Sequence, residues 1–173
     1  MPNKFLPGDA LSNESLRRTF GLFATGVTVV TARAEDGPVG VAVNAFCSVS
    51  LDPPLILVCA GAQSESWPVI KAVGPFAVNI LAEGQGALCK RFSRKGLDRF
   101  AGIAERPGYT GAPLLVDASV ASLECLPHSE HVAGDHTIVV GRVVALHEYE
   151  QTSPLVFFSS DFRQLRPTER PVS

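Results

Sequence analysis

The sequence predicts a mainly β protein, a barrel or sandwich of antiparallel strands with helices packed around it. Roughly six or seven segments have the length and the β-branched composition of strands, and they follow one another at short spacing. Helical patterns come between them without the regular strand–helix alternation of parallel α/β proteins. With 173 residues, the chain is expected to form one domain over residues 1–173, with a core at about 12–165 and mobile tails at 1–11 and 166–173.

The individual elements follow from apolar periodicity. Residues 12–24 open on the cap-forming Ser12 and place Leu16, Phe20 and Phe23 at helical spacing, which predicts an amphipathic helix. An Asp-Gly-Pro turn later joins two β-branched stretches into a hairpin. The expected elements after the first helix are strands at 27–33, 39–46 and 55–60, a helix at 64–74, a strand at 75–81, a short helix at 84–93, long strands at roughly 114–126 and 136–149, and a last strand at 154–158.

Charge and composition narrow the class of protein. The formal net charge of −2 gives no general attraction to nucleic acid or to anionic membranes, so neither is expected as a partner. The sequence has neither a signal-peptide segment nor an apolar run near the ~20 residues of a membrane span, which predicts a cytoplasmic protein. Apolar residues make up 46% and charged residues 18%, so we expect a second subunit to cover apolar surface in a homodimer.

The cysteines and histidines do not predict a metal site. The four cysteines are far apart and include no Cys-x-x-Cys pair, which is typical of buried, reduced thiols. His128 and His131 are three residues apart, and on an extended segment their side chains point to opposite faces. We therefore expect no bound metal.

The stretch VAVNAFCSVSLDPP, residues 41–54, is the first candidate binding element. The common glycine-rich nucleotide fingerprints are absent, so any nucleotide must be held in another way. Alternation along a strand places Ala42 and Asn44 on one face, and Ser48 and Ser50 bring hydroxyls to the strand's end. Small side chains beside polar ones would let backbone N–H groups approach a flat polar ring. The alternative is an ordinary strand that ends in a serine-rich turn.

The stretch KRFSRKGLDR, residues 90–99, is the second candidate. It holds five of the chain's 15 basic residues although the protein is slightly acidic overall, so a local phosphate site is indicated. The alternative is a solvated basic face on a short helix. A nucleic-acid patch is disfavoured, because only Phe92 and Phe100 lie among the charges.

The third candidate is the triplet Gly134, Asp135 and His136 at the start of a predicted strand. Gly134 allows a positive φ or a close backbone approach, and Asp135 can accept a hydrogen bond from the His136 ring. The imidazole could then donate to a planar ligand or stack beside it. The alternative is a surface histidine in a turn.

Taken together, these stretches resemble the short-chain flavin reductases, the reductase components of two-component flavin-dependent monooxygenases. The resemblance covers about residues 16–165, in the family's order, through the motifs GVTVVTA, PVGVAVNAFCSVSLDPPLILVC, SESWPVI, FAVNILAEGQGALCKRFS, DRFAGI, GAPLL, LECLPHSEHVAGDHTIVVGRV and PLVFF. It is specific because the motifs are collinear. It implies a flavin-binding split barrel, an antiparallel Greek key with peripheral helices, assembled as a homodimer with the flavin near the subunit interface.

The resemblance also implies positions for the cofactors. Asp135 and His136 would seat the nicotinamide cofactor over the flavin, with Asp135 orienting the imidazole. The flavin-binding residues implied are Ala42, Val43, Asn44 and Ala45 at the ring, Cys47, Ser48 and Ser50 toward the phosphate, the loop Ala60, Gly61, Ala62, Gln63 and Ser64, the phosphate-end residues Arg91, Phe92 and Lys95, and the C-terminal Phe158, Asp161 and Phe162.

Two departures from the family pattern concern the flavin. Many members carry a hydroxyl residue where this chain has Ala45 or Cys47, and a lost hydrogen bond of about 0.5–1.5 kcal/mol net affects the choice between FMN and FAD. Ser159 and Ser160 replace a frequent Gly and basic residue, which affects closure of the cleft.

The implied reaction is hydride transfer from NADH, with NADPH as the alternative donor, to FMN or FAD. The reduced flavin would leave for a separate monooxygenase. The sequence contains no catalytic dyad, as expected where the cofactors supply the reactive chemistry. Two other functions stay open on the same barrel, a flavin-binding protein and a flavin-dependent oxidase, neither of which turns over nicotinamide.

Overall fold

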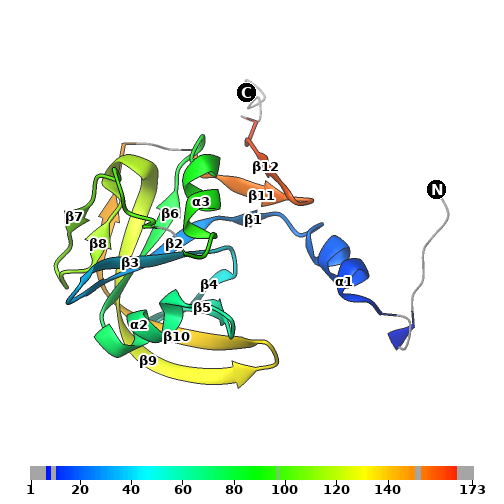
Figure 1. Cartoon of the computed structure of the whole chain (residues 1–173), viewed down its shortest axis with the longest axis horizontal. Helices are drawn as coiled ribbons and strands as arrows, with labels where there is room; N and C mark the ends of the chain where they lie inside the picture. The colour runs from blue at the N-terminus through cyan, green and yellow to red at the C-terminus, as the bar shows by residue number, and fades with distance from the viewer. Residues whose placement is uncertain (1–6, 9–10, 97, 151–152, 167–173) are drawn as a thin grey trace, which may run out of the picture.

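A computed structural model describes residues 7–8, 11–96, 98–150 and 153–166. Its centre is an antiparallel sheet of seven strands in the order β3-β2-β6-β9-β10-β5-β4 (Figure 1). The predicted tails at 1–11 and 166–173 lie mostly outside the described residues. The strands of this sheet are β2 (Thr28–Ala34), β3 (Gly37–Val43), β4 (Phe46–Leu51), β5 (Pro54–Gly61), β6 (Phe76–Leu81), β9 (Ser119–Ala133) and β10 (His136–Glu148).

The other elements surround this sheet. The short strands form two small sheets, β1-β11-β12 and β7-β8. The bounds of these elements are β1 (Thr25–Gly26), β7 (Arg106–Pro107), β8 (Pro113–Leu114), β11 (Val156–Phe158), β12 (Asp161–Arg163), helices α1 (Asn13–Phe20), α2 (Ser66–Val73) and α3 (Gly86–Phe92), and the 3-10 helix η2 (Val116–Ala118). The predicted mainly β, antiparallel architecture is confirmed.

The sheet curls so that its outermost strands, β3 and β4, lie near each other. The two strands follow one another in the chain and are joined by Asn44 and Ala45 alone. The Cys59 amide of β5 donates to the Ala45 carbonyl at 3.0 Å, which ties this connection to the sheet. The connection therefore sits at the seam where the barrel closes, with its backbone close to the neighbouring strands.

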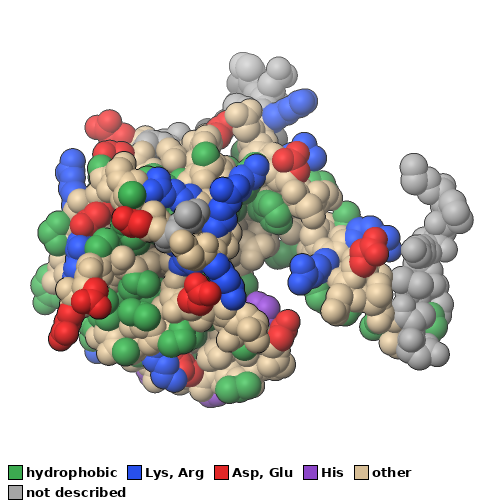
Figure 2. Space-filling view, viewed as in Figure 1, with side chains coloured by type: hydrophobic (Ala, Val, Ile, Leu, Met, Phe, Trp, Pro, Cys, Tyr) green, Lys and Arg blue, Asp and Glu red, His purple; other side chains and the backbone are tan. Residues whose placement is uncertain are grey.

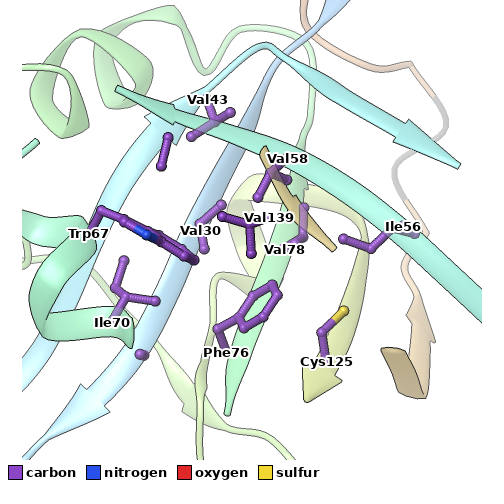
Figure 3. Close-up of a cluster of buried hydrophobic side chains, with 12 residues drawn as sticks. Val30, Val43, Ile56, Val58, Trp67, Ile70, Phe76, Val78, Cys125 and Val139 are labelled. Atoms are coloured by element: carbon purple, nitrogen blue, oxygen red, sulfur yellow. The ribbon is translucent and has the colours of Figure 1, made fainter. Parts of the chain in front are cut away.

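The barrel is filled by β-branched and aromatic side chains that alternate with outward-facing ones. Val30, Val78 and Val139 point into the interior from three strands, with Phe76 below them and Trp67 to one side in this view (Figure 3). All five are buried. Burial of each such side chain contributes about 1.5–3 kcal/mol, so this cluster is a main source of stability. No described helix has the length and apolar character needed to cross a bilayer.

A buried carboxylate fastens the loop between β7 and β8. Glu124 of β9 is fully buried, and its oxygens accept hydrogen bonds from the backbone N–H groups of Tyr109 and Thr110 and from the Thr110 hydroxyl. His147 Nε2 lies 2.7 Å from Oε1. Cβ of any side chain at Gly108 would come within 2.5 Å of this carboxylate, so the loop passes directly over it.

Three predicted elements differ from those observed. The first helix ends at Phe20, and its predicted inner face is outside, with Phe20 69% and Phe23 78% exposed, because α1 stands away from the barrel (Figure 1). The strand predicted at roughly 114–126 is β9, which continues through Ala133 because its ladder with β10 runs to the tip of the hairpin. The strand predicted at 39–46 ends at Val43, where the chain turns toward β4.

Candidate functional site

A cavity of about 420 Å³ opens where the end of β3, helix α3 and the β11–β12 hairpin meet. Segments far apart in the sequence, within 42–44, 89–94 and 157–162, supply most of its wall. Its volume falls in the range of roughly 300–1,000 Å³ found for small-molecule sites. Figure 2 shows several Lys and Arg side chains on the face of the molecule where α3 lies in Figure 1. We call this space the α3 cavity.

The end of β3 brings uncharged side chains to the α3 cavity. Ala42, Val43 and Asn44 all line it. Val43 also packs into the barrel core, and Asn44 is exposed in the connection that follows β3. A small residue beside an amide gives a planar ligand both an apolar contact and hydrogen-bonding groups. Four predicted residues of the 41–54 stretch lie outside the lining of the α3 cavity. They are the exposed Ala45, Cys47 and Ser48 and the half-buried Ser50.

Helix α3 and the turn after it bring the positive charge. Lys90 and Arg94 line the α3 cavity together with Cys89 and Ser93. Residues four apart lie on one side of a helix. Lys90 and Arg94 are four apart, as are Cys89 and Ser93, so each pair reaches the cavity from the same side of the last turn of α3 and the residues that follow it. The predicted Lys95 is exposed and lies outside the lining. The helical spacing of these residues is visible in the sequence and could have identified Lys90 and Arg94.

The other two predicted residues of this segment hold α3 in place. The Arg91 guanidinium donates to the carbonyl oxygens of Asp98 and Ala101 at 3.0 and 2.6 Å. Phe92 is fully buried, and its ring meets the ring of Phe100 edge-on with centroids 5.0 Å apart. The structure therefore places both side chains outside the α3 cavity, where they support the wall that carries Lys90 and Arg94.

The β11–β12 hairpin closes the third side. Asp161 and Phe162, two of the three C-terminal residues predicted to bind flavin, line the α3 cavity. The third, Phe158, does not, and Phe157 lines the cavity instead. Phe157 and Phe162 are direct partners in the ladder, and their rings meet with centroids 5.6 Å apart. Neighbouring residues of a strand point to opposite faces, so Phe158 points elsewhere. Ser160 at the hairpin turn is also part of the wall.

The turn of this hairpin adopts a backbone conformation that side chains rarely take. Ser159 and Ser160 have φ of 50° and 64°, which costs roughly 1–2 kcal/mol per residue. The Ser159 amide donates to the Gly21 carbonyl at the end of α1 at 2.7 Å. The hairpin tip is therefore held against the N-terminal segment.

The Gly-Asp-His triplet lies at the tip of the β9–β10 hairpin. Gly134 has a φ of 63°, the positive value that a glycine adopts without strain. Asp135 Oδ1 lies 2.8 Å from His136 Nδ1, and this hydrogen bond lowers the pKa of Asp135. Both side chains are accessible to a ligand, with Asp135 95% and His136 49% exposed. The carboxylate stays ionised at neutral pH and fixes the orientation of the imidazole.

The loop at residues 60–64 forms one unit with this triplet. His136 pairs with Gly61 in the β10–β5 ladder, and the Ala62 amide donates to the Asp135 carbonyl at 2.9 Å. Ser64 Oγ accepts a hydrogen bond from the Trp67 amide at the start of α2. Ala60 is buried and Gln63 is exposed.

The triplet and the α3 cavity lie at the same level of the barrel. The Ala45 carbonyl accepts from Cys59 of β5, which places Asn44 level with the end of that strand, and His136 of β10 lies on the other side of it. Neighbouring strands are ~4.8 Å apart. The β10 partner of Cys59 is Ile138, and His136 lies two residues farther along β10, opposite Gly61. His136 is therefore on the strand next to β5, roughly two strand spacings from the β3–β4 connection that borders the α3 cavity.

Sequence comparison identifies the family. A family model described as a flavin reductase like domain matches residues 20–166. The chain belongs to this flavin reductase family. It is 38% identical over 159 residues to the reductase subunit HsaB of a flavin-dependent monooxygenase from Rhodococcus jostii, a match that covers 92% of this chain and 81% of HsaB. It is 39% identical over 164 residues to the FMN reductase (NADH) SmoA of Agrobacterium fabrum, with 94% and 92% covered.

Solved structures of the family have the same fold. The NADH:FAD oxidoreductase SgcE6 of Streptomyces globisporus C-1027 superposes with a TM-score of 0.87 at 36% identity, over 96% of this chain and all of that one. The styrene monooxygenase flavin reductase of Pseudomonas putida S12 gives a TM-score of 0.81 at 33% identity, over 89% of this chain and 99% of that one. The flavin reductase barrel implied by the sequence resemblance is therefore confirmed.

The residues present fit a flavin. The α3 cavity combines a neutral wall at Ala42 and Asn44, which suits a polar ring system, with Lys90 and Arg94, which suit its phosphate. Of the predicted flavin-binding residues, Ala42, Val43, Asn44, Asp161 and Phe162 lie in the wall of the α3 cavity, and the Gly-Asp-His triplet lies outside it. Lys90 and Arg94 of the predicted basic stretch 90–99 also line the wall. Its members outside the predictions are Val27, Cys89, Ser93, Phe157 and Ser160.

Proposed function

We propose that this protein is an NAD(P)H:flavin oxidoreductase that transfers hydride from NADH to FMN or FAD and passes the reduced flavin to a separate monooxygenase. The observation that carries the proposal is the α3 cavity, where neutral β3 residues and the cations of α3 meet at the level of His136. The relatives named FMN reductase (NADH) and NADH:FAD oxidoreductase support this reaction. The relative named as a monooxygenase reductase subunit supports the partner.

The residues of the α3 cavity have distinct tasks in this proposal. Ala42 and Asn44 contact the flavin ring, and Lys90 and Arg94 balance the charge of its phosphate. The bound flavin supplies the acceptor of the hydride. The two cofactors carry the reactive groups. The protein therefore contributes mainly by aligning them and by excluding water from the contact between them.

His136 and Asp135 position the nicotinamide cofactor. Asp135 Oδ1 lies 2.8 Å from Nδ1 of the imidazole, so this contact fixes the ring and leaves Nε2 to face the ligand. Gly61 opposite His136 carries no side chain, so a flat ring can approach the strand closely. These two residues hold and orient the hydride donor and need not exchange a proton with it.

A homodimer and a cytoplasmic location are parts of the same proposal. Phe20, Leu22 and Phe23 at the end of α1 are 61–78% exposed, a degree of apolar exposure that a second subunit would relieve. All four cysteines are free, as expected in a reducing compartment.

Steady-state turnover tests the function. NADH consumption, followed at its absorption band, should rise with added FAD or FMN far beyond one equivalent per protein. Arg94→Gln should raise the KM for flavin about tenfold because a charge-assisted contact to phosphate is lost. Arg106→Gln, an exposed arginine on β7 away from α3, is the matched control and should leave this KM unchanged (Figure 1). A flavin-binding protein or an oxidase would show no stimulation of NADH consumption by flavin.

A further inference from the structure

A second hollow adjoins the α3 cavity on the C-terminal side of the hairpin. It encloses about 830 Å³ and lies between the turn before α3 and the chain that continues from β12. Phe162 lines both spaces, so one aromatic side chain divides them. We call this second space the C-terminal hollow. None of the predicted flavin-binding residues other than Phe162 lies in its wall.

The wall of the C-terminal hollow has the chemistry of a nucleotide site. Arg163 and Arg166 supply two cations, which suit a phosphate. Leu165, which is 58% exposed, supplies apolar surface that suits a purine face, whereas Leu155 is buried. Glu83 supplies carboxylate acceptors for ribose hydroxyls or for an exocyclic amino group.

One cation from each space contacts the β11–β12 hairpin at Asp161 or Phe162. Lys90 Nζ, from the α3 cavity, lies 5.7 Å from the centre of the Phe162 ring. Arg163 Nη1 lies 3.3 Å from Oδ2 of Asp161, another residue of the α3 cavity wall. Because Phe162 lines both spaces and Arg163 is paired with Asp161 of the α3 cavity wall, the two spaces meet at this hairpin.

Phe162 is fixed in this dividing position by the first turn of α3. A Cβ at Gly86 would come within 2.7 Å of Phe162 Cδ2, so the ring rests directly against the glycine backbone. Its edge-on contact with Phe157 restrains it from the other side. The boundary between the two spaces is thus part of the packed structure.

We infer that the C-terminal hollow binds the adenylate half of FAD, and that FAD is the preferred flavin of this protein over FMN. The inference rests on the proposed function. FMN ends at the phosphate that Lys90 and Arg94 hold, whereas FAD continues from that phosphate through a second phosphate into adenosine. Arg166, with Arg163 beside it, would contact the second phosphate, and Leu165 would pack against the adenine.

Binding of the oxidised flavins without NADH tests this assignment. Isothermal titration calorimetry on the full chain should give a Kd for FAD at least about tenfold below that for FMN, because only FAD gains the contacts of the C-terminal hollow. Arg166→Gln should weaken FAD about tenfold, with FMN as the internal reference that does not respond, because Arg166 lines the C-terminal hollow and not the α3 cavity. Arg106→Gln is the control arginine and should alter neither Kd.

The outcomes separate the two proposals. Equal Kd values for FAD and FMN would overturn the adenylate site while leaving a working reductase. An equal weakening of FAD and FMN binding by Arg166→Gln would do the same. Adenosine diphosphate provides an independent probe, since it should weaken binding of FAD but not of FMN. Competition with both flavins equally would also overturn the assignment. If neither flavin binds and neither stimulates NADH consumption, the reductase proposal itself fails.

Discussion

Replacing Glu124 with glutamine tests how strongly one buried carboxylate holds the β7–β8 loop. Oε1 accepts from the Tyr109 amide at 2.8 Å and lies 2.7 Å from His147 Nε2. Oε2 accepts from the Thr110 amide and from the Thr110 hydroxyl, both at 2.6 Å. The glutamate is fully buried, so water cannot replace a lost partner.

The geometry sets the expected cost of Glu124→Gln. A glutamine has one oxygen, so in either orientation its NH₂ group faces one of the two backbone N–H donors, of Tyr109 or of Thr110. One buried donor left unpaired costs about 1–3 kcal/mol, and the remaining hydrogen bonds lose their charge assistance. We expect a total loss of about 3 kcal/mol, which lowers the melting temperature of a chain of this size by roughly 6–12 °C.

Calorimetric and urea unfolding measure this loss. Glu65→Gln is the matched control, because Glu65 is exposed and lies 3.8 Å from Lys95, a surface pair that contributes at most about 1 kcal/mol. An equal fall in melting temperature for the two variants would refute the role given to the buried carboxylate.

The same residue predicts a pH dependence. Burial raises the pKa of Glu124, but the hydrogen bonds from Thr110, His147 and Tyr109 together outweigh burial and hold the pKa below the ordinary value of 4.5. A depressed pKa contributes stability that is present above the unfolded value and is lost as pH falls through the folded one. The difference in melting temperature between wild type and Glu124→Gln should therefore shrink from about pH 6 to about pH 3. A difference that stays constant over this interval would contradict the assignment.

Three further outcomes are expected. His136→Ala should raise the KM for NADH or slow hydride transfer about tenfold while the circular dichroism spectrum is unchanged, and unaltered flavin reduction kinetics would remove His136 from the mechanism. Gly141→Ala should destabilise the protein by about 1–3 kcal/mol in urea unfolding, because the added Cβ would come within 2.7 Å of Phe76 Cζ, and an unchanged midpoint would argue against this packing. The exposed Cys47 should react with Ellman's reagent at about pH 8 while Cys125, whose pKa burial raises to about 12, stays unmodified until unfolding; equal rates would contradict that burial.

Most of the fold was predictable because its signals are local. Several strands of the main sheet, such as β2, β5 and β6, are apolar runs bounded by turn residues, and these predict their positions to within about one residue. The exposed face of α1 was not predictable, since Phe20 and Phe23 form a regular apolar stripe whatever surface finally covers it. The end of β9 was missed because its length is set by pairing with β10, a contact that no sequence window contains.

In the candidate site, too, some residues follow from local sequence patterns and others only from the pairing of distant strands. Ala42 and Asn44 follow from strand alternation, and Lys90 and Arg94 follow from helical spacing once α3 is known to face the barrel seam. The choice of Phe157 over Phe158 depends on pairing with β1 and β12, so it could come only from the folded structure.

Anaerobic flavin reduction is the direct test of hydride transfer by this protein. Purified protein is mixed with NADH and a stoichiometric amount of FAD or FMN, and the visible absorption of the oxidised flavin is followed against a protein-free control. Rapid bleaching is expected with at least one flavin, and the reaction with FAD is expected to be faster or to saturate at a lower concentration. If neither flavin bleaches faster than the control, with NADH or with NADPH, the protein is not a flavin reductase, and its barrel is that of a flavin binder or of an oxidase with a different donor.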